Sequence, residues 1–204
     1  MRVAVAGHGA TGHIYPLLGF ADALLAAGHD VIILTGSDLI SWLTDLGYPA
    51  EPVGETIGWG LAQVQSRFPE LTTSLPDDQA WRLDAELFAD ALPRAMASAL
   101  VTAFESRRPD LVLYESTNFG AVLAAAELNI PAVCLDLWAV GRWHVQRDEL
   151  EQRVRAVWAE RSAVPLPLDP LLGLAHLDPA PTSLRNPATT EGDSIRLPTP
   201  DRVG

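Results

Sequence analysis

His13 is the residue whose type and neighbours best suit proton transfer. It lies between an apolar run, Val3 to Ala6, and a helical pattern that we expect to begin near Pro16. Proline fits the first turn of a helix, but deeper in the helix its ring clashes with the carbonyl four residues back. His13 then stands beside a helix N-terminus, where the helix dipole favours the neutral imidazole that a general base needs. Local packing or capping is the alternative role for this histidine.

Glu115 is the second candidate, and it directly follows the apolar run Leu111 to Tyr114. If both runs are strands of a doubly wound sheet, their ends share one edge, and Glu115 can accept a hydrogen bond from His13. Such a carboxylate fixes the imidazole tautomer and stabilises the cation that forms on proton abstraction. The alternative is that Glu115 caps the helix that follows.

A dinucleotide site is the competing interpretation of the glycine loop, which has the spacing G-x-G-x-x-G from Gly7. That site needs the helix to start inside the motif, whereas Pro16 predicts a later start. The next apolar run ends at Thr35, where a ribose-binding acid is expected. All 14 basic residues are arginine, so the Tyr-Lys pair of short-chain reductases is excluded. An NAD(P)-binding reductase is therefore the least favoured function.

Composition narrows the class of protein further. The chain has 204 residues, of which 48% are hydrophobic and 20% charged, as in a globular protein. A net charge of −12 argues against a nucleic-acid partner. Its single cysteine, Cys134, lies in an apolar run and predicts neither a disulfide framework nor a metal site. No apolar run approaches the ~20 residues of a membrane helix, so we predict a cytoplasmic location without a membrane span.

Alternating strand and helix patterns predict an α/β fold, a doubly wound Rossmann-like parallel sheet with flanking helices in a single domain. We expect loops and short helix at residues 54–77, and a long helical segment at 78–106 that is kinked or broken at Pro93. Strands are expected at 2–6, 30–34, 50–53, 111–114 and 131–135, and helices at 16–27, 38–46, 118–128 and 147–161.

The composition shifts at Pro165. Eight of the 16 prolines lie in residues 165–204, which disfavours long helices there. We therefore predict a Rossmann-like domain at 1–164 and a Pro-rich, linker-like closing segment at 165–204.

These motifs together resemble a known family. Gly12-His13-Ile14-Tyr15-Pro16 resembles the Gly-His-x-x-Pro segment that opens GT-B glycosyltransferases of the UDP-glycosyltransferase superfamily. The run from Pro109 to Glu115 is similar to the strand of their N-terminal domain that carries an acidic partner, and Asn129 to Val133 is similar to the segment after the next helix. The bacterial members that glycosylate macrolides, enediynes and aromatic polyketides are the most similar.

The resemblance implies the N-terminal half of a GT-B fold, which binds the sugar acceptor. His13 would be the general base and Glu115, which is Asp in many members, its acidic partner. Met96 and Trp81 are weaker candidates for lining the acceptor-binding cleft. Core packing is the alternative for each tryptophan. The expected substrate-binding residues, some of them aromatic, are Thr11, Gly12, Trp59, Phe68, Asn118, Trp138, Trp143 and His144.

The function that this implies is the acceptor-binding half of an inverting glycosyltransferase, which joins a sugar to a hydroxyl of a small apolar aglycone. The chain shows no pattern for the donor domain, so the nucleotide-sugar is expected only with a donor-domain partner chain. The donor domain could equally belong to a longer protein of which this chain is a fragment. We expect no metal and no other cofactor, and a homodimer is a further possibility. The alternative is a standalone GT-B-like domain, used as a small-molecule binding or auxiliary protein or as an acid–base enzyme of the cyclase or isomerase type.

Overall fold

A computed structural model describes residues 1–73, 75–76, 79–137, 146–179 and 194–196. In these residues one sheet contains seven parallel strands in the order β3-β2-β1-β4-β5-β6-β7. The chain runs outward from β1 in one direction and then from β4 in the other. The strands are β1 Arg2–Ala6, β2 Asp30–Thr35, β3 Ala50–Pro52, β4 Leu111–Glu115, β5 Ala132–Leu135, β6 Ala175–Asp178 and β7 Ser194–Arg196.

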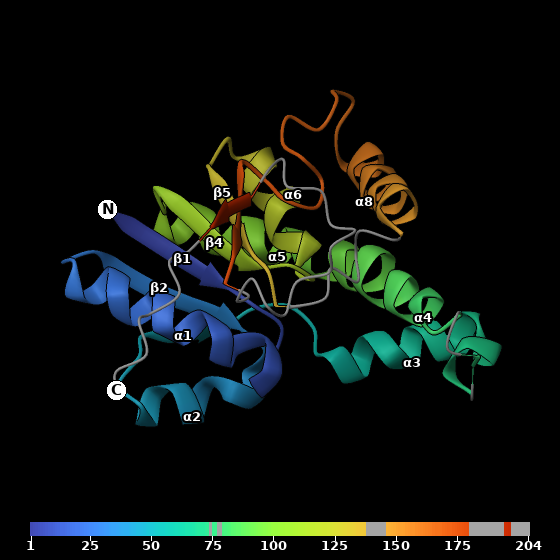
Figure 1. Ribbon diagram of the computed structural model, residues 1–204, viewed down its shortest axis with the longest axis horizontal. Helices are drawn as coiled ribbons and strands as arrows, with labels where there is room; N and C mark the ends of the chain where they lie inside the picture. The colour runs from blue at the N-terminus through green and yellow to red at the C-terminus, as the bar shows by residue number, and fades with distance from the viewer. Residues whose placement is uncertain (74, 77–78, 138–145, 180–193, 197–204) are drawn as a thin grey trace.

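Helices cover both faces of this sheet (Figure 1). On one face lie α1 and α2, and on the other lie α5, α6 and α8. The helices are α1 Thr11–Ala26, α2 Ile40–Asp45, α3 Ile57–Arg67, α4 Trp81–Glu86, α5 Leu92–Arg107, α6 Phe119–Glu127 and α8 Arg147–Arg161, with shorter turns η1 Ser37–Leu39, η2 Pro69–Thr72 and η3 Leu87–Ala91. This confirms the predicted doubly wound α/β fold.

The two-residue alternation of the strands divides the core into two clusters. Val3 and Val5 of β1 pack with α1 and α2, whereas Ala4 and Ala6 pack with the helices of the opposite face. In β4 the same alternation sends Leu113 toward α1 and Tyr114 toward the other face. The same alternation continues at the strand ends, so that neighbouring residues there point to opposite faces of the sheet.

The predicted start of the first helix is wrong. The helix α1 begins at Thr11, so Pro16 lies inside it rather than in its first turn. Proline at this position loses the single hydrogen bond to the carbonyl of Gly12. Burial of Ile14 and Leu17 against the sheet offsets that loss, since both side chains are fully buried.

The predicted break near Pro93 takes the form of a π-turn, η3, directly before that proline. It joins α4 to α5, so that Trp81–Arg107 is one helical run of 27 residues. By length and composition alone this run could cross a membrane, which the sequence had not indicated. In the structure it is a core helix, because 61% of its most apolar window is buried.

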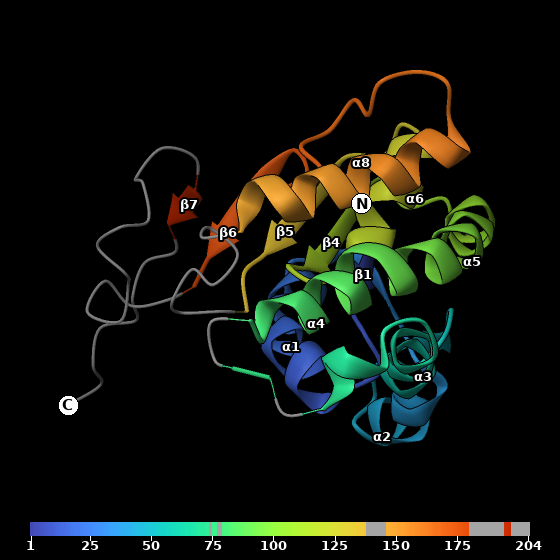
Figure 2. The same ribbon diagram turned by 90° about the vertical axis from the view of Figure 1, so that its right-hand side faces the viewer.

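Two further segments differ from the sequence prediction. Residues 57–67, expected to be loop and short helix, form the 11-residue helix α3, whose N-cap Thr56 accepts a hydrogen bond from the Trp59 backbone. After residue 164, β6 and β7 extend the sheet beyond β5 (Figure 2). Part of the Pro-rich closing segment is thus sheet. Proline limits helix there, but strand pairing supplies the backbone hydrogen bonds.

Candidate functional site

The two predicted catalytic residues meet where the strand order reverses, between β1 and β4. Open α/β sheets bind ligands at such a switch point, outside the carboxyl ends of the strands. Ala6 pairs with Tyr114, so the loop after β1 and Glu115 at the end of β4 leave the sheet side by side. His13 is the third residue of α1, which follows that loop.

His13 and Glu115 form a hydrogen-bonded pair, as predicted. The Nδ1 atom of His13 lies 3.0 Å from Oε1 of Glu115. Because a carboxylate only accepts, Nδ1 carries the hydrogen, and a neutral ring then has its lone pair on Nε2. The Glu115 side chain is completely buried, whereas that of His13 is 15% exposed. The pair therefore has a fixed inner member and an outer member that solvent can reach.

Thr117, which the sequence analysis did not identify, completes the environment of the carboxylate. Its hydroxyl lies 2.8 and 2.7 Å from the two oxygens of Glu115, and its backbone N–H donates to Oε2 at 2.6 Å. Burial on its own raises the pKa of Glu115, but the hydrogen bonds from the His13 ring and the Thr117 hydroxyl oppose it. The net effect lowers the pKa of Glu115 below its ordinary 4.5.

His8 is a second histidine at the site that the sequence analysis did not assign. Its ring is buried, with Nε2 3.2 Å from the carbonyl oxygen of Thr117. Burial lowers the pKa of His8, against the attraction of Glu115, which raises it. Phe88, from the π-turn η3, packs against both imidazoles, at 5.3 Å from the His8 ring and 5.7 Å from the His13 ring between centroids.

Packing explains two glycines of the loop. A Cβ on Gly9 would come within 2.8 Å of the backbone of Gly36, and one on Gly7 within 2.7 Å of the Ile14 side chain. Pro16 does not exclude a dinucleotide site, contrary to the prediction, because α1 does start inside the glycine motif. The missing ribose-binding acid still counts against such a site, since β2 ends at Thr35 without an acidic residue.

The other predicted binding residues are distributed as follows. Thr11 and Gly12 are exposed in the first turn of α1, next to His13. Asn118 is fully buried, and neither polar atom of its amide has a hydrogen-bond partner among the described residues. Trp59 and Phe68 are partly buried and pack against the larger core cluster. Trp138, Trp143 and His144 lie outside the described residues.

The weaker candidates also belong to the core. Met96 is 1% exposed, and Trp81 packs against the same cluster. In the described part of the chain, no group of three or more His, Cys, Asp or Glu side chains is placed to hold a metal ion.

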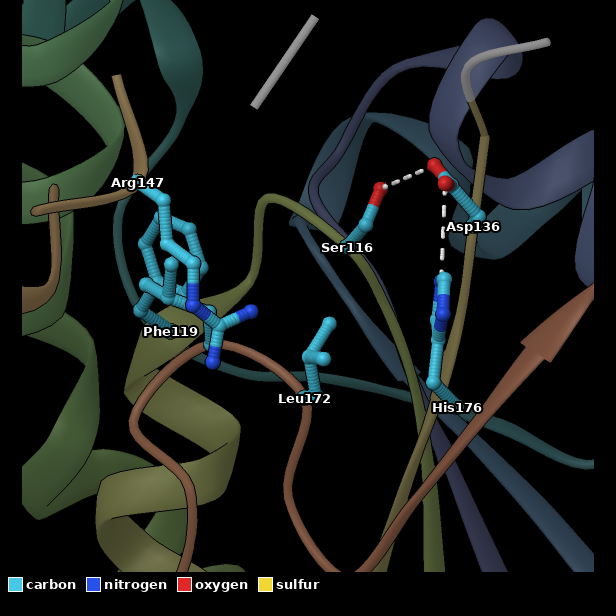
Figure 3. A pocket seen from close by; sticks show the side chains of 7 residues that line it. Ser116, Phe119, Asp136, Arg147, Leu172 and His176 are labelled. Carbon is cyan, nitrogen blue, oxygen red and sulfur yellow. Dashed lines mark hydrogen bonds and ion pairs between the residues drawn. The ribbon is translucent and has the colours of Figure 1, made fainter. Parts of the chain in front are cut away.

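A second polar cluster lies at the same edge of the sheet, around Asp136 (Figure 3). Strand alternation places Ser116 of this cluster on the face opposite Glu115. Asp136 follows β5, and its carboxylate lies 3.3 Å from the Ser116 hydroxyl and 3.4 Å from Nε2 of His176. Ser116 and His176 both point toward Asp136, while Arg147 and Phe119 stand across a small cavity of ≈ 20 Å³. That volume suits a single water molecule.

A family model described as "Erythromycin biosynthesis protein CIII-like, N-terminal domain" matches residues 22–197. Among curated relatives, the 3-alpha-mycarosylerythronolide B desosaminyl transferase of Saccharopolyspora erythraea is 25% identical over an aligned length of 217 residues, gaps included, and the match covers 91% of this chain and 51% of the relative. The Elloramycin glycosyltransferase ElmGT of Streptomyces olivaceus is 29% identical over 165 residues, which are 79% of this chain and 41% of the relative. The chain thus spans about half the length of these relatives or less.

Solved glycosyltransferase structures share the fold. SsfS6 of Streptomyces sp. SF2575 superposes with a TM-score of 0.72 at 23% identity, over 90% of this chain and 51% of that one. The spinosyn rhamnosyltransferase SpnG, solved with spinosyn aglycone, has a TM-score of 0.72 at 19% identity, over 96% of this chain and 49% of that one. The described fold is therefore that of the N-terminal half of GT-B glycosyltransferases.

Proposed function

The chain belongs to the family of the erythromycin biosynthesis protein CIII-like N-terminal domain, and from that premise we propose its role in sugar transfer. It is the acceptor-binding half of an inverting glycosyltransferase, and its sugar acceptor is a small natural-product aglycone that presents a hydroxyl group. A donor domain, in the same longer protein or on a partner chain, supplies the nucleotide-sugar. The named relatives are a desosaminyl transferase and a glycosyltransferase, which supports a role in sugar transfer.

The observation that carries the proposal is the hydrogen bond of 3.0 Å between His13 Nδ1 and Glu115 Oε1. It leaves Nε2 of His13, on a partly exposed ring, as the nitrogen that can take a proton. The family match begins at residue 22, after His13, so the role of this residue rests on its geometry. A base in this position, oriented by a buried carboxylate, is the arrangement that activates a hydroxyl nucleophile.

The reaction follows from that geometry. Nε2 of His13 removes the proton of the aglycone hydroxyl as its oxygen bonds to the anomeric carbon of the sugar. The bond from that carbon to the phosphate oxygen breaks, and the nucleoside diphosphate leaves with the electron pair. Glu115 stays ionised, as its lowered pKa favours, and stabilises the imidazolium formed on His13. Attack opposite the leaving group inverts the anomeric configuration.

Relatives support the two substrates. The spinosyn rhamnosyltransferase was solved with its aglycone, and SsfS6 with thymidine diphosphate. We assign the aglycone to the carboxyl edge of the sheet described above, where His13, Thr11 and Gly12 are exposed or partly exposed. Asn118 is the further binding candidate, because its buried amide has donors and an acceptor without partners among the described residues.

The proposal is tested first by aglycone binding and then by sugar transfer. Calorimetry of the 204-residue chain against macrolide and aromatic polyketide aglycones should show saturable binding of at least one, and NADPH should show none. Adding the separately produced donor half of a relative, with thymidine-diphosphate sugars, should then give glycosylated product. Saturable NADPH binding without aglycone binding, or no binding of any aglycone, would overturn the proposal.

A further inference from the structure

We propose that His8 is a positioning residue for the pair His13–Glu115. Its ring joins the loop after β1 to the turn between β4 and α6, and thereby keeps the base in register with its carboxylate. The catalytic consequence rests on the function proposed above, but the contact itself is measurable without any sugar transfer.

The first support is a hydrogen bond between segments that are distant in sequence. Nε2 of His8 lies 3.2 Å from the carbonyl oxygen of Thr117, 109 positions away. A carbonyl only accepts, so Nε2 carries the hydrogen. The same two segments hold Glu115, which lies 3.5 Å from the backbone nitrogen of His8 and also binds the Thr117 hydroxyl. His8 is thus tied to Thr117 and to the Glu115 carboxylate itself.

The second support is the packing of the ring. The His8 imidazole lies edge-on to that of His13, with 5.5 Å between centroids and 82° between planes. Phe88 contacts both rings, so that the three rings form one cluster. His8 is 2% exposed, so its ring occupies a fixed place in the core. A ring fixed there limits the orientations open to His13, whose imidazole is less buried.

The third support is the charge of His8. Its Nδ1 is buried without a hydrogen-bond partner among the described residues. Protonating it would create an N–H with no acceptor, which adds to the cost of burying a charge. His8 therefore stays neutral next to Glu115, and the positive charge formed during catalysis is confined to His13. A second cation on this carboxylate would weaken its effect on the base.

Substitutions separate this role from simple core packing. His8→Phe keeps a ring of similar shape but removes the donor to Thr117. His8→Gln places an amide N–H at about the reach of Nε2, whereas His8→Asn is polar but too short for it. The readout is the Nδ1–H proton of His13 in NMR spectra of the ¹⁵N-labelled chain, and its rate of exchange with solvent.

We expect His8→Gln to keep the exchange rate of the parent chain, and His8→Phe and His8→Asn to raise it about tenfold, the factor expected for the loss of one net hydrogen bond.

The matched control is His29→Phe, at the opposite end of the sheet, which should leave the exchange rate unchanged. If His8→Phe fails to fold, the difference between the Gln and Asn variants decides. Equal rates in the parent chain, His8→Phe and His8→Asn, or in the Gln and Asn variants, would refute the role of His8, while aglycone binding tests the proposed function independently.

Discussion

The carboxyl edge of the sheet carries two carboxylate–imidazole pairs, and they differ in what the imidazole can reach. Glu115 and His13 are 3.0 Å apart, and the His13 side chain is 15% exposed. Asp136 and His176 are 3.4 Å apart, and the His176 side chain is 4% exposed. Each carboxylate also contacts a hydroxyl, from Thr117 in the first pair and from Ser116 in the second. Similar chemistry is thus placed once at an accessible position and once in the interior.

The alternation of strand side chains separates the two pairs. Glu115 lies on the α1 side of the sheet, and Ser116, the next residue, turns to the other side. His13 is in the first turn of a helix, which exposes one edge of its ring, whereas His176 is inside strand β6. The lesson is that a carboxylate–imidazole distance does not by itself identify a reactive pair. The element that carries the imidazole decides whether a substrate can meet it.

The largest expected effect is on transfer by the assembled enzyme. His13→Ala should lower kcat by about 10²–10⁴-fold, the usual contribution of a positioned general base. His176→Ala should leave kcat within about threefold of the parent at a temperature where both are folded, because the His176 side chain is 4% exposed and lies apart from the proposed base. Product formation with a donor half and a nucleotide-sugar measures both. A kcat loss in His176→Ala as large as in His13→Ala would show that the two pairs act together.

For the free energy of unfolding we expect the opposite order, with His176→Ala more damaging than His13→Ala. His176→Ala leaves the Asp136 carboxylate, which is 8% exposed, without its imidazole partner. Loss of a buried polar partner costs about 1–3 kcal/mol of unfolding free energy. His13→Ala should cost less, because water can reach the vacated side of Glu115. Urea unfolding at neutral pH gives both values, and a costlier His13→Ala would contradict this assignment of roles.

Acid should destabilise the site in two separate steps. The pKa of His8 is lowered from its ordinary 6.5, so the unfolded chain takes up a proton there first and stability falls as the pH drops below 6.5. The pKa of Glu115 is lowered from 4.5, so its stabilising effect is present above 4.5 and is lost as the pH falls through its folded-state pKa.

Two substitutions distinguish these steps. His8→Phe should flatten the dependence of the unfolding free energy on pH near 6.5, and Glu115→Gln should reduce the loss below 4.5. Urea unfolding between pH 3 and 8, in steps of about half a unit, measures both. Equal slopes in Glu115→Gln and the parent chain below pH 4.5 would show that Glu115 is not held ionised by its partners.

The sequence was sufficient to predict the pair His13–Glu115 and most of the sheet, because both depend on local patterns. Short apolar runs between turn residues predicted β1, β4 and β5, and parallel order then brought His13 and Glu115 to one edge. The helix α8 begins and ends where its charged, amphipathic pattern does. The start of α1 was missed because burial of Ile14 and Leu17 outweighs the local preference of Pro16.

The surroundings of the pair were not predictable in the same way. His8 reaches Thr117 across 109 positions, and Phe88 enters from the π-turn, so no local pattern links them. Thr117 had a usable signal, since a threonine two residues after a strand-ending glutamate can bind that carboxylate locally. The strands β6 and β7 were missed because proline-rich composition speaks against helix but says little about strand pairing.

The smallest effect that separates the two pairs is that of their hydroxyl groups. Thr117→Val removes a donor that lies within 2.8 Å of both Glu115 oxygens, although the backbone N–H to Oε2 remains. Ser116→Ala removes a longer contact of 3.3 Å to Asp136 and the oxygen that accepts from the Leu137 backbone at 3.2 Å.

We expect Thr117→Val to cost about 1 kcal/mol of unfolding free energy and Ser116→Ala less, in proportion to hydrogen-bond quality. Urea unfolding of the two variants, with Thr117→Ser as the control that keeps the hydroxyl, measures the difference. If Ser116→Ala proves the costlier change, the interior pair is the better-bonded one, and the tight network around Glu115 is not what holds His13 in place.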